Sequence, residues 1–169
     1  MAKQVYECNW VPSHVTEAEL DGLVLIGALG SKDTIHWRAP GKECPPTPRE
    51  GEVVVFVDHL ARGFKPPGSK FYRDVLADFQ LHPQDTGPNS VTNMCHFQVL
   101  CEAFFQEEPT VELFRDLFHL NCRSEFTDGS NTELGGVAIQ KRKEVTYPHA
   151  KLHSHPKEWN QTWFYCKDT

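Results

Sequence analysis

The feature that most constrains the fold is the apolar run VVVFVDHLARGF, residues 53–64, because such a run can form either a buried strand or a helix. A strand explains VVVFV, since buried strands are continuous apolar runs, but it leaves DHLARGF without a turn signal before Gly63. At the roughly 100° per residue of a helix, most apolar residues share one face and Asp58, His59 and Arg62 lie opposite. Gly63 then stands where helices commonly end. The pattern favours a helix with Asp58, His59 and Arg62 in solvent, and the strand remains the alternative.

Two further helices are indicated by their N-terminal caps. Thr16 and Glu19 have the spacing of a capping box, and the apolar run behind them extends to Gly30, a plausible C-terminal stop. Between this helix and the run above, residues 31–50 are rich in proline and indicate an extended connector. Ser69 can cap a second helix, in which aromatic and aliphatic residues recur at three- and four-residue steps.

Two more helices are expected before residue 120. The segment 91–106, capped by Asn89 or Ser90, is apolar on most of its circumference, as in a central helix surrounded by others. Pro109 and Thr110 introduce another helix, over 111–120. Its apolar stripe comprises Leu113, Phe114, Leu117 and Phe118.

The character of the chain changes after this point. A stretch rich in Gly, Ser, Asn and Asp predicts a long loop, and 135–145 and 161–168 then have strand composition and are expected to pair antiparallel. The predicted fold is therefore α+β: a mainly helical bundle of about four to five helices over 14–120, closed by a small C-terminal antiparallel β-sheet over 134–168. At 169 residues, one domain covering 1–169 is expected.

Charge and hydropathy narrow the function classes. The net charge is −6, which disfavours general nucleic-acid binding, and the one basic cluster is Lys141–Lys143. The longest apolar run, GLVLIGALG, is about half the length that a membrane span needs, and no secretory signal is visible. An intracellular location is expected, in either cytoplasm or nucleus. The six scattered cysteines are then expected to be free thiols.

Three carboxylates occur in the order of a transposase site: Asp58, Asp116 and Glu158. Two-metal phosphoryl transfer needs such carboxylates to converge, and their usual scaffold is a sheet. Because two of the three fall on expected helices, in a chain with 23 acidic residues, the trio is a weak alternative. No catalytic residue is assigned on this basis.

Other polar clusters give candidate binding sites. His149, His153 and His155 have spacings that allow one transition metal to be chelated, but no complete ligand set accompanies them, so no metal or cofactor is expected. The residues proposed for binding a partner are Trp37, Arg38, Trp159 and Trp163. Three of these are tryptophans, whose rings can stack on bases, which keeps a nucleic-acid-binding module open as an alternative.

Four ordered motifs carry a family resemblance: the block VVVFVDHLARGF, the PNS cap, the LCEAFF helix and the terminal WFYCKD. From about Thr16 to Asp168 the chain resembles the plant domain described as putative gypsy-type transposon, a retrotransposon-associated region. The family name records genomic context, so the resemblance implies no site residue. It implies an isolated N-terminal domain or a short host gene, because the reverse transcriptase, protease and integrase regions of a complete element are missing.

The expected function is a non-enzymatic protein-protein interaction domain of retrotransposon origin, acting in an element particle or in a co-opted host pathway. The expected partner is another protein or a second copy of the chain, with nucleic acid disfavoured and no membrane. A metal-dependent nuclease or transposase-like enzyme is the first alternative to this function. A nucleic-acid-binding module is the second.

Overall fold

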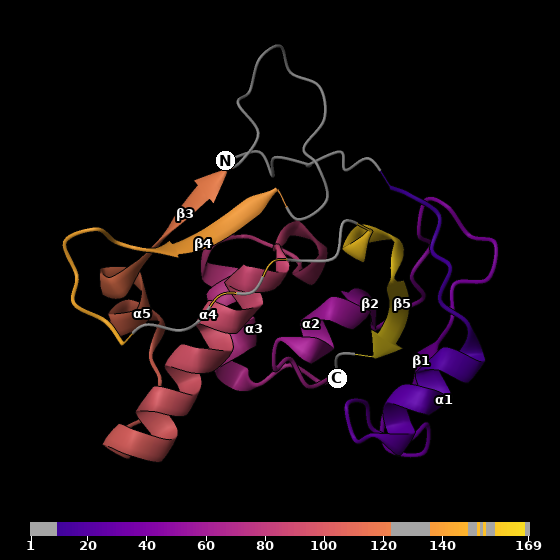
Figure 1. Cartoon of the computed structure of the whole chain (residues 1–169), viewed down its shortest axis with the longest axis horizontal. Helices are drawn as coiled ribbons and strands as arrows, with labels where there is room; N and C mark the ends of the chain where they lie inside the picture. The colour runs from indigo at the N-terminus through magenta and orange to yellow at the C-terminus, as the bar shows by residue number, and fades with distance from the viewer. Residues whose placement is uncertain (1–9, 123–135, 149–151, 153, 155–157, 168–169) are drawn as a thin grey trace, which may run out of the picture.

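The computed structural model describes residues 10–122, 136–148, 152, 154 and 158–167. Over these residues the chain forms five α-helices and five strands, and the strands make two separate sheets (Figure 1). Helices α2, α3 and α4 lie between the two sheets (Figure 1). The α-helices are α1 (Glu17–Leu25), α2 (Val57–Ala61), α3 (Lys70–Asp78), α4 (Pro88–Val99) and α5 (Val111–Leu117). The strands are β1 (Trp37–Arg38), β2 (Glu52–Phe56), β3 (Phe118–Cys122), β4 (Val137–Lys141) and β5 (Trp163–Lys167).

The larger sheet joins the two ends of the chain. Its order is β1-β5-β2, with the C-terminal strand β5 in the centre and antiparallel to both neighbours. In this register Val55 lies opposite Phe164, and Trp37 lies opposite Cys166. The fold is α+β, but the prediction of a helical bundle with a sheet only at the C-terminus is wrong. The C-terminal strand β5 pairs with two strands from the N-terminal third of the chain. Local sequence patterns do not encode pairing between segments so far apart.

Burial on both sides of β2 explains its uniform apolar sequence. Val55 faces the main core, whereas Val54 and Phe56 face a second cluster with Trp163 and Tyr165. The prediction of a helix over this segment is therefore wrong for Glu52–Phe56, and the strand alternative holds there. Every position of VVVFV is apolar, so it fits a helical face and a doubly buried strand equally well.

The polar end of the same run is also more buried than expected. His59, in α2, is fully buried. Asp58 and Arg62 form an i,i+4 ion pair at 3.5 Å, and their side chains are only 12% and 9% exposed. The predicted solvent-exposed face of Asp58, His59 and Arg62 is therefore wrong, because the short helix α2 is enclosed by the core on more than one side.

The smaller sheet pairs β3 with β4, with Leu120 opposite Ile139. The predicted pairing of the two C-terminal strands is wrong, and residues 118–120, expected to be helical, belong to β3. Side chains of α4 then bind the backbone of β4. Ser90 Oγ accepts a hydrogen bond from Ile139 N at 2.9 Å, and Asn93 Nδ2 donates one to Ile139 O at 2.8 Å. Helix α4 thus takes the place of a third strand.

The helix caps follow the local sequence closely. Thr16 and Glu19 form the expected capping box, and Ser69 Oγ accepts a hydrogen bond from Tyr72 N at 3.1 Å. Helix α1 ends at Leu25, before the expected Gly30. Helix α4 has Pro88 in its first turn and Gly87 as its N-cap, so the proposed Asn89 and Ser90 caps are wrong.

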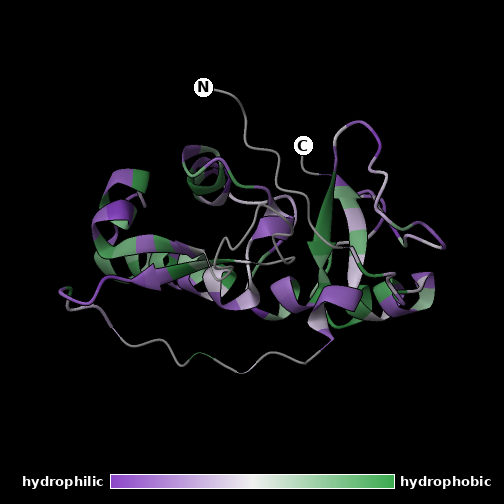
Figure 2. Ribbon diagram, turned by 90° about the horizontal axis from the view of Figure 1, so that it is seen from above, coloured by the Kyte–Doolittle hydropathy of each residue, from purple (hydrophilic) through white to green (hydrophobic). Residues whose placement is uncertain are grey.

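The core between the sheets is aromatic. Phe97 of α4 packs against Phe114 of α5 with ring centroids 5.2 Å apart, and Phe114 stacks on Phe118 at 4.5 Å. Figure 2 shows hydrophobic residues in the strands of both sheets and in the helices, with hydrophilic residues interspersed in both. None of the described helices has the length and apolar character to cross a membrane.

Candidate functional site

The three carboxylates proposed for metal catalysis lie in different elements. Asp58 is in α2 and pairs with Arg62, Asp116 is exposed on α5, and Glu158 is exposed directly before the short helix Trp159–Gln161. Within the described part of the chain, no group of three or more His, Cys, Asp or Glu side chains is placed to hold a metal ion. The proposed histidine ligands lie outside the described residues: His149, His153 and His155.

The tryptophans proposed for binding contribute to the interior. Trp37 is buried, and its Nε1 donates to Gly30 O at 2.9 Å. Trp163 is fully buried, and its Nε1 donates to Val11 O at 2.9 Å. Trp159 is half-buried and packs edge-on against Phe56, with ring centroids 4.8 Å apart. These rings hold the larger sheet and its neighbouring segments together.

Arg38 is likewise used inside the protein. It binds Glu52 through two hydrogen bonds of 2.9 Å each and Glu43 through a third of 2.9 Å, and its guanidinium lies 3.8 Å from the ring centroid of Tyr165. Hydrogen bonds from Thr47, Tyr165 and Arg38 lower the pKa of Glu43 to about 2. This network fastens the proline-rich connector to the sheet.

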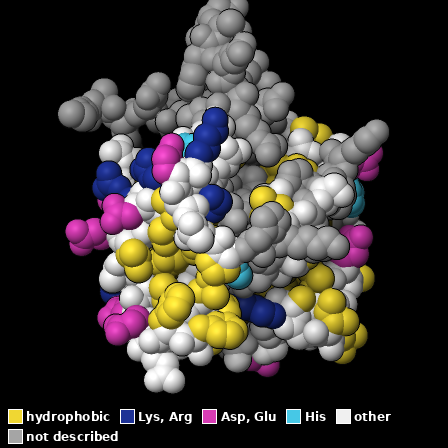
Figure 3. All heavy atoms as spheres, turned by 60° about the vertical axis from the view of Figure 1, so that its left-hand side comes forward, with side chains coloured by type: hydrophobic (Ala, Val, Ile, Leu, Met, Phe, Trp, Pro, Cys, Tyr) yellow, Lys and Arg dark blue, Asp and Glu magenta, His cyan; other side chains and the backbone are white. Residues whose placement is uncertain are grey.

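An apolar surface that the sequence did not predict lies where α4 ends. The helix continues as a π-helix, η2 (Leu100–Phe105), which ends at Gln106 in the left-handed conformation. Phe104 and Phe105 are 72% and 65% exposed, and Val99, about one turn earlier, is 51% exposed. We call Val99, Phe104 and Phe105 the exposed apolar surface. Figure 3 turns the left-hand side of Figure 1 toward the viewer and shows hydrophobic side chains gathered on the lower half of that face.

Several acidic residues lie close in sequence to the exposed apolar surface. Four exposed glutamates lie within or close to η2 and the start of α5: Glu102, Glu107, Glu108 and Glu112. No salt bridge with a described residue neutralises any of the four, whereas Arg115, the next basic residue, pairs with Asp78 at 3.4 Å. Figure 3 shows acidic side chains at the margin of the hydrophobic area. The exposed apolar surface is therefore accompanied by exposed acidic side chains.

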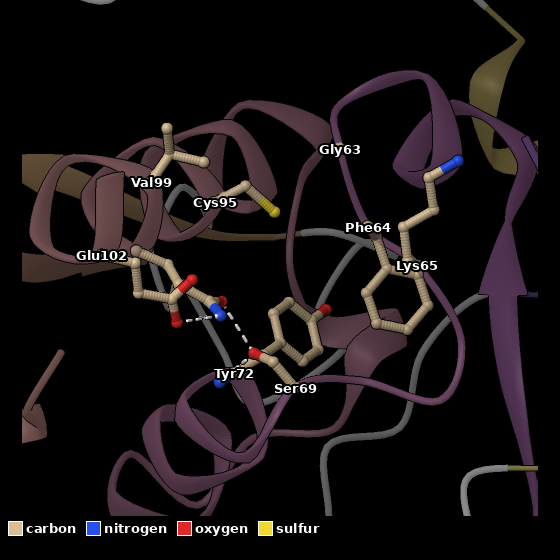
Figure 4. A pocket seen from close by; sticks show the side chains of 9 residues that line it. Gly63, Phe64, Lys65, Ser69, Tyr72, Cys95, Val99 and Glu102 are labelled. Atoms are coloured by element: carbon tan, nitrogen blue, oxygen red, sulfur yellow. Dashed lines mark hydrogen bonds between the residues drawn. The ribbon is translucent and has the colours of Figure 1, made fainter. Parts of the chain in front are cut away.

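A pocket of about 230 Å³ opens beside the exposed apolar surface (Figure 4). Its apolar walls are Phe64, Tyr72, Cys95 and Val99, so Val99 belongs to both features. Burial raises the pKa of the Cys95 thiol to about 11, which keeps it protonated near neutral pH. The pocket thus has the character of a binding site and lacks an activated nucleophile at Cys95.

Polar side chains form a hydrogen-bonded row along one side of this pocket (Figure 4). Ser69 Oγ donates to Gln98 Oε1 at 2.7 Å, and Gln98 Nε2 donates to Glu102 Oε1 at 2.8 Å. The row begins at the N-cap of α3, so the orientation of the Glu102 carboxylate is tied to a fixed helix end. Lys65 points its amine away from the pocket, where it donates to Gly27 O at 2.7 Å.

Comparison of the chain with known proteins finds a similarity for one part of it. No curated protein and no solved structure matches it. One family model, Transposase_28, described as "Putative gypsy type transposon", matches residues 53–122. This segment runs from β2 to β3 and contains both the exposed apolar surface and the pocket. Residues 53–122 are therefore similar to the family described as "Putative gypsy type transposon".

Proposed function

We propose that this chain is a non-enzymatic protein-interaction domain of retrotransposon origin, which docks a partner protein on the exposed apolar surface. The observation that supports this most directly is the pair Phe104 and Phe105, two adjacent aromatic side chains that remain 72% and 65% exposed. Burying a phenylalanine contributes about 1.5–3 kcal/mol, and aromatic residues are enriched in interface centres. Contiguous exposed apolar area on a folded domain is typical of interaction sites.

The acidic residues near the exposed apolar surface favour a partner of opposite charge. Glu102, Glu107, Glu108 and Glu112 favour a segment that carries Lys or Arg beside its apolar residues. A two-fold contact with a second copy through the same surface would bring these glutamates against each other, in a chain of net charge −6. The proposed partner is therefore another protein with a basic amphipathic segment, such as a helix with one apolar face.

Selection from a random peptide library on the immobilised domain tests this proposal, because it needs no named partner. We expect the selected peptides to combine apolar residues at helical spacing with Lys or Arg, and to lose binding to the double variant Phe104→Ser, Phe105→Ser. Both positions are exposed, so this variant should keep the wild-type circular dichroism spectrum and thermal midpoint.

The chain offers a matched control for the loss of exposed apolar area. Leu25 and Ile26, at the end of α1, are 88% and 76% exposed and lie outside the family-matched segment. The variant Leu25→Ser, Ile26→Ser should keep full peptide binding. Peptides without basic residues, or peptides that bind equally well after loss of both phenylalanines, would show that the proposed surface is not the docking site.

A further inference from the structure

We infer that the pocket beside the exposed apolar surface receives a single arginine side chain of the partner. This inference rests on the proposed function and adds the identity of one partner residue. The pocket volume, about 230 Å³, is below the roughly 300–1,000 Å³ of sites for drug-sized ligands. It therefore suits one side chain better than a cofactor or a metabolite.

The polar side of the pocket favours a cation. Gln98 holds Oε1 of Glu102 by its 2.8 Å hydrogen bond, and no described residue donates to the second carboxylate oxygen. Because Ser69 fixes Gln98, the Glu102 carboxylate is oriented before a ligand arrives. Preorganised acceptors bind charged donors with a smaller loss of side-chain entropy. Lys65, the basic residue of the pocket wall, turns its amine toward the carbonyls of Gly27 and Ala28.

The apolar side of the pocket favours a guanidinium over an ammonium group. The rings of Phe64 and Tyr72 lie with centroids 4.8 Å apart and a 42° tilt, and both line the pocket. A planar guanidinium can stack on an aromatic face while it donates hydrogen bonds to a carboxylate, whereas an ammonium is compact and strongly hydrated. The aliphatic stem of an arginine can lie along Val99.

The position of Val99 connects the pocket to the docking surface. This side chain lines the pocket and is also 51% exposed beside the π-helix. A partner segment that covers Phe104 and Phe105 can therefore place one long basic side chain in the pocket from the same backbone. The acidic margin attracts the segment, and the pocket selects one residue within it.

Amide chemical shifts during titration with N-acetyl-arginine methylamide test the inference. We expect shifts at Cys95, Val99 and Glu102 in the wild type, and at least about fivefold weaker binding of the citrulline analogue, which has the same shape without the charge. The lysine analogue should also bind more weakly. Glu102→Gln should weaken arginine binding to the same extent, whereas Glu112→Gln, with the same change of charge outside the pocket, should leave it unchanged.

Several outcomes would overturn the inference: no shifts at these amides, equal shifts with citrulline, tighter binding of the lysine analogue, or equal losses in the two glutamate variants. The double variant Phe104→Ser, Phe105→Ser separates the inference from the proposed function. It should still bind the arginine probe, because neither phenylalanine lines the pocket. If the probe binds but selected peptides ignore the phenylalanines, the proposed function fails while the pocket assignment stands. If the peptides need the phenylalanines but the probe does not bind, the pocket assignment alone fails.

Discussion

Ser90 of α4 binds the backbone of β4 at Ile139 as a neighbouring strand would, because its Oγ accepts the Ile139 N–H at 2.9 Å. The same oxygen donates to Val137 O at 3.2 Å. All of these groups are buried. The edge of the smaller sheet is therefore covered by a helix side chain, and α4 is fixed relative to β4.

Replacing Ser90 with Ala should destabilise the domain by about 1–3 kcal/mol, because the Ile139 N–H would remain buried without its acceptor. Urea unfolding followed by circular dichroism measures the loss. Thr92→Ala is the matched control on the same helix, since Thr92 Oγ1 only makes a long 3.4 Å bond to Pro88 O within α4. Equal losses in the two variants would show that the Ser90 bonds do not stabilise the sheet edge.

Acid should destabilise the domain through His59. Burial lowers the pKa of this histidine from 6.5 to about 4 in the folded state, so the unfolded chain takes up a proton in this range that the folded chain does not. The free energy of unfolding therefore decreases as pH falls from 6.5 toward 4, by roughly 3 kcal/mol in all, and His59 adds no pH dependence above that window.

Urea unfolding of the wild type and of His59→Gln across this range isolates the effect, because carboxylates contribute nearly equally to both proteins. The difference between them should shrink as pH falls. A constant difference would mean that burial does not lower the pKa of His59 in the folded state.

Loss of the Arg38 network should loosen the connector between α1 and β2. Arg38→Met leaves Glu52 and Glu43 without their cation in a site where the Arg38 and Glu52 side chains are 16% and 11% exposed, and should cost about 1–3 kcal/mol. Faster tryptic cleavage after Lys42 should accompany this loss. Arg115→Met removes an exposed pair with Asp78 and should cost less than about 1 kcal/mol. Unchanged cleavage after Lys42 would show that the network does not fasten the connector.

Structural features that depend on residues close together in the sequence could be predicted from it. The capping box of Thr16 and Glu19 and the Ser69 cap depend on side chains three residues apart, and both form as expected. The position of β5 between β1 and β2 depends on contacts between distant segments, which a local pattern does not encode. The uniformly apolar VVVFV was consistent with both structures until its partner strand was known.

The candidate site was missed for a related reason. An apolar circumference over residues 91–106 indicated a central, buried helix, but the segment changes to a π-helix at Leu100, and Phe104 and Phe105 emerge into solvent. The acidic QEEP that follows was the available signal, since a charged turn directly after two phenylalanines marks the place where the helix leaves the core. The residues chosen instead, Trp37 and Trp163, are buried.

The most direct test of the account is the affinity of one selected basic amphipathic peptide for three proteins, measured by fluorescence anisotropy at low and moderate salt. Truncation of interface hot spots costs about 2 kcal/mol or more, so Phe104→Ser, Phe105→Ser should weaken binding by at least about thirtyfold relative to the wild type. The control Leu25→Ser, Ile26→Ser should match the wild type, and affinity should fall as salt screens the glutamates. Equal affinity of the phenylalanine variant and the wild type, or loss of binding only in the α1 control, would contradict the assignment of the docking surface.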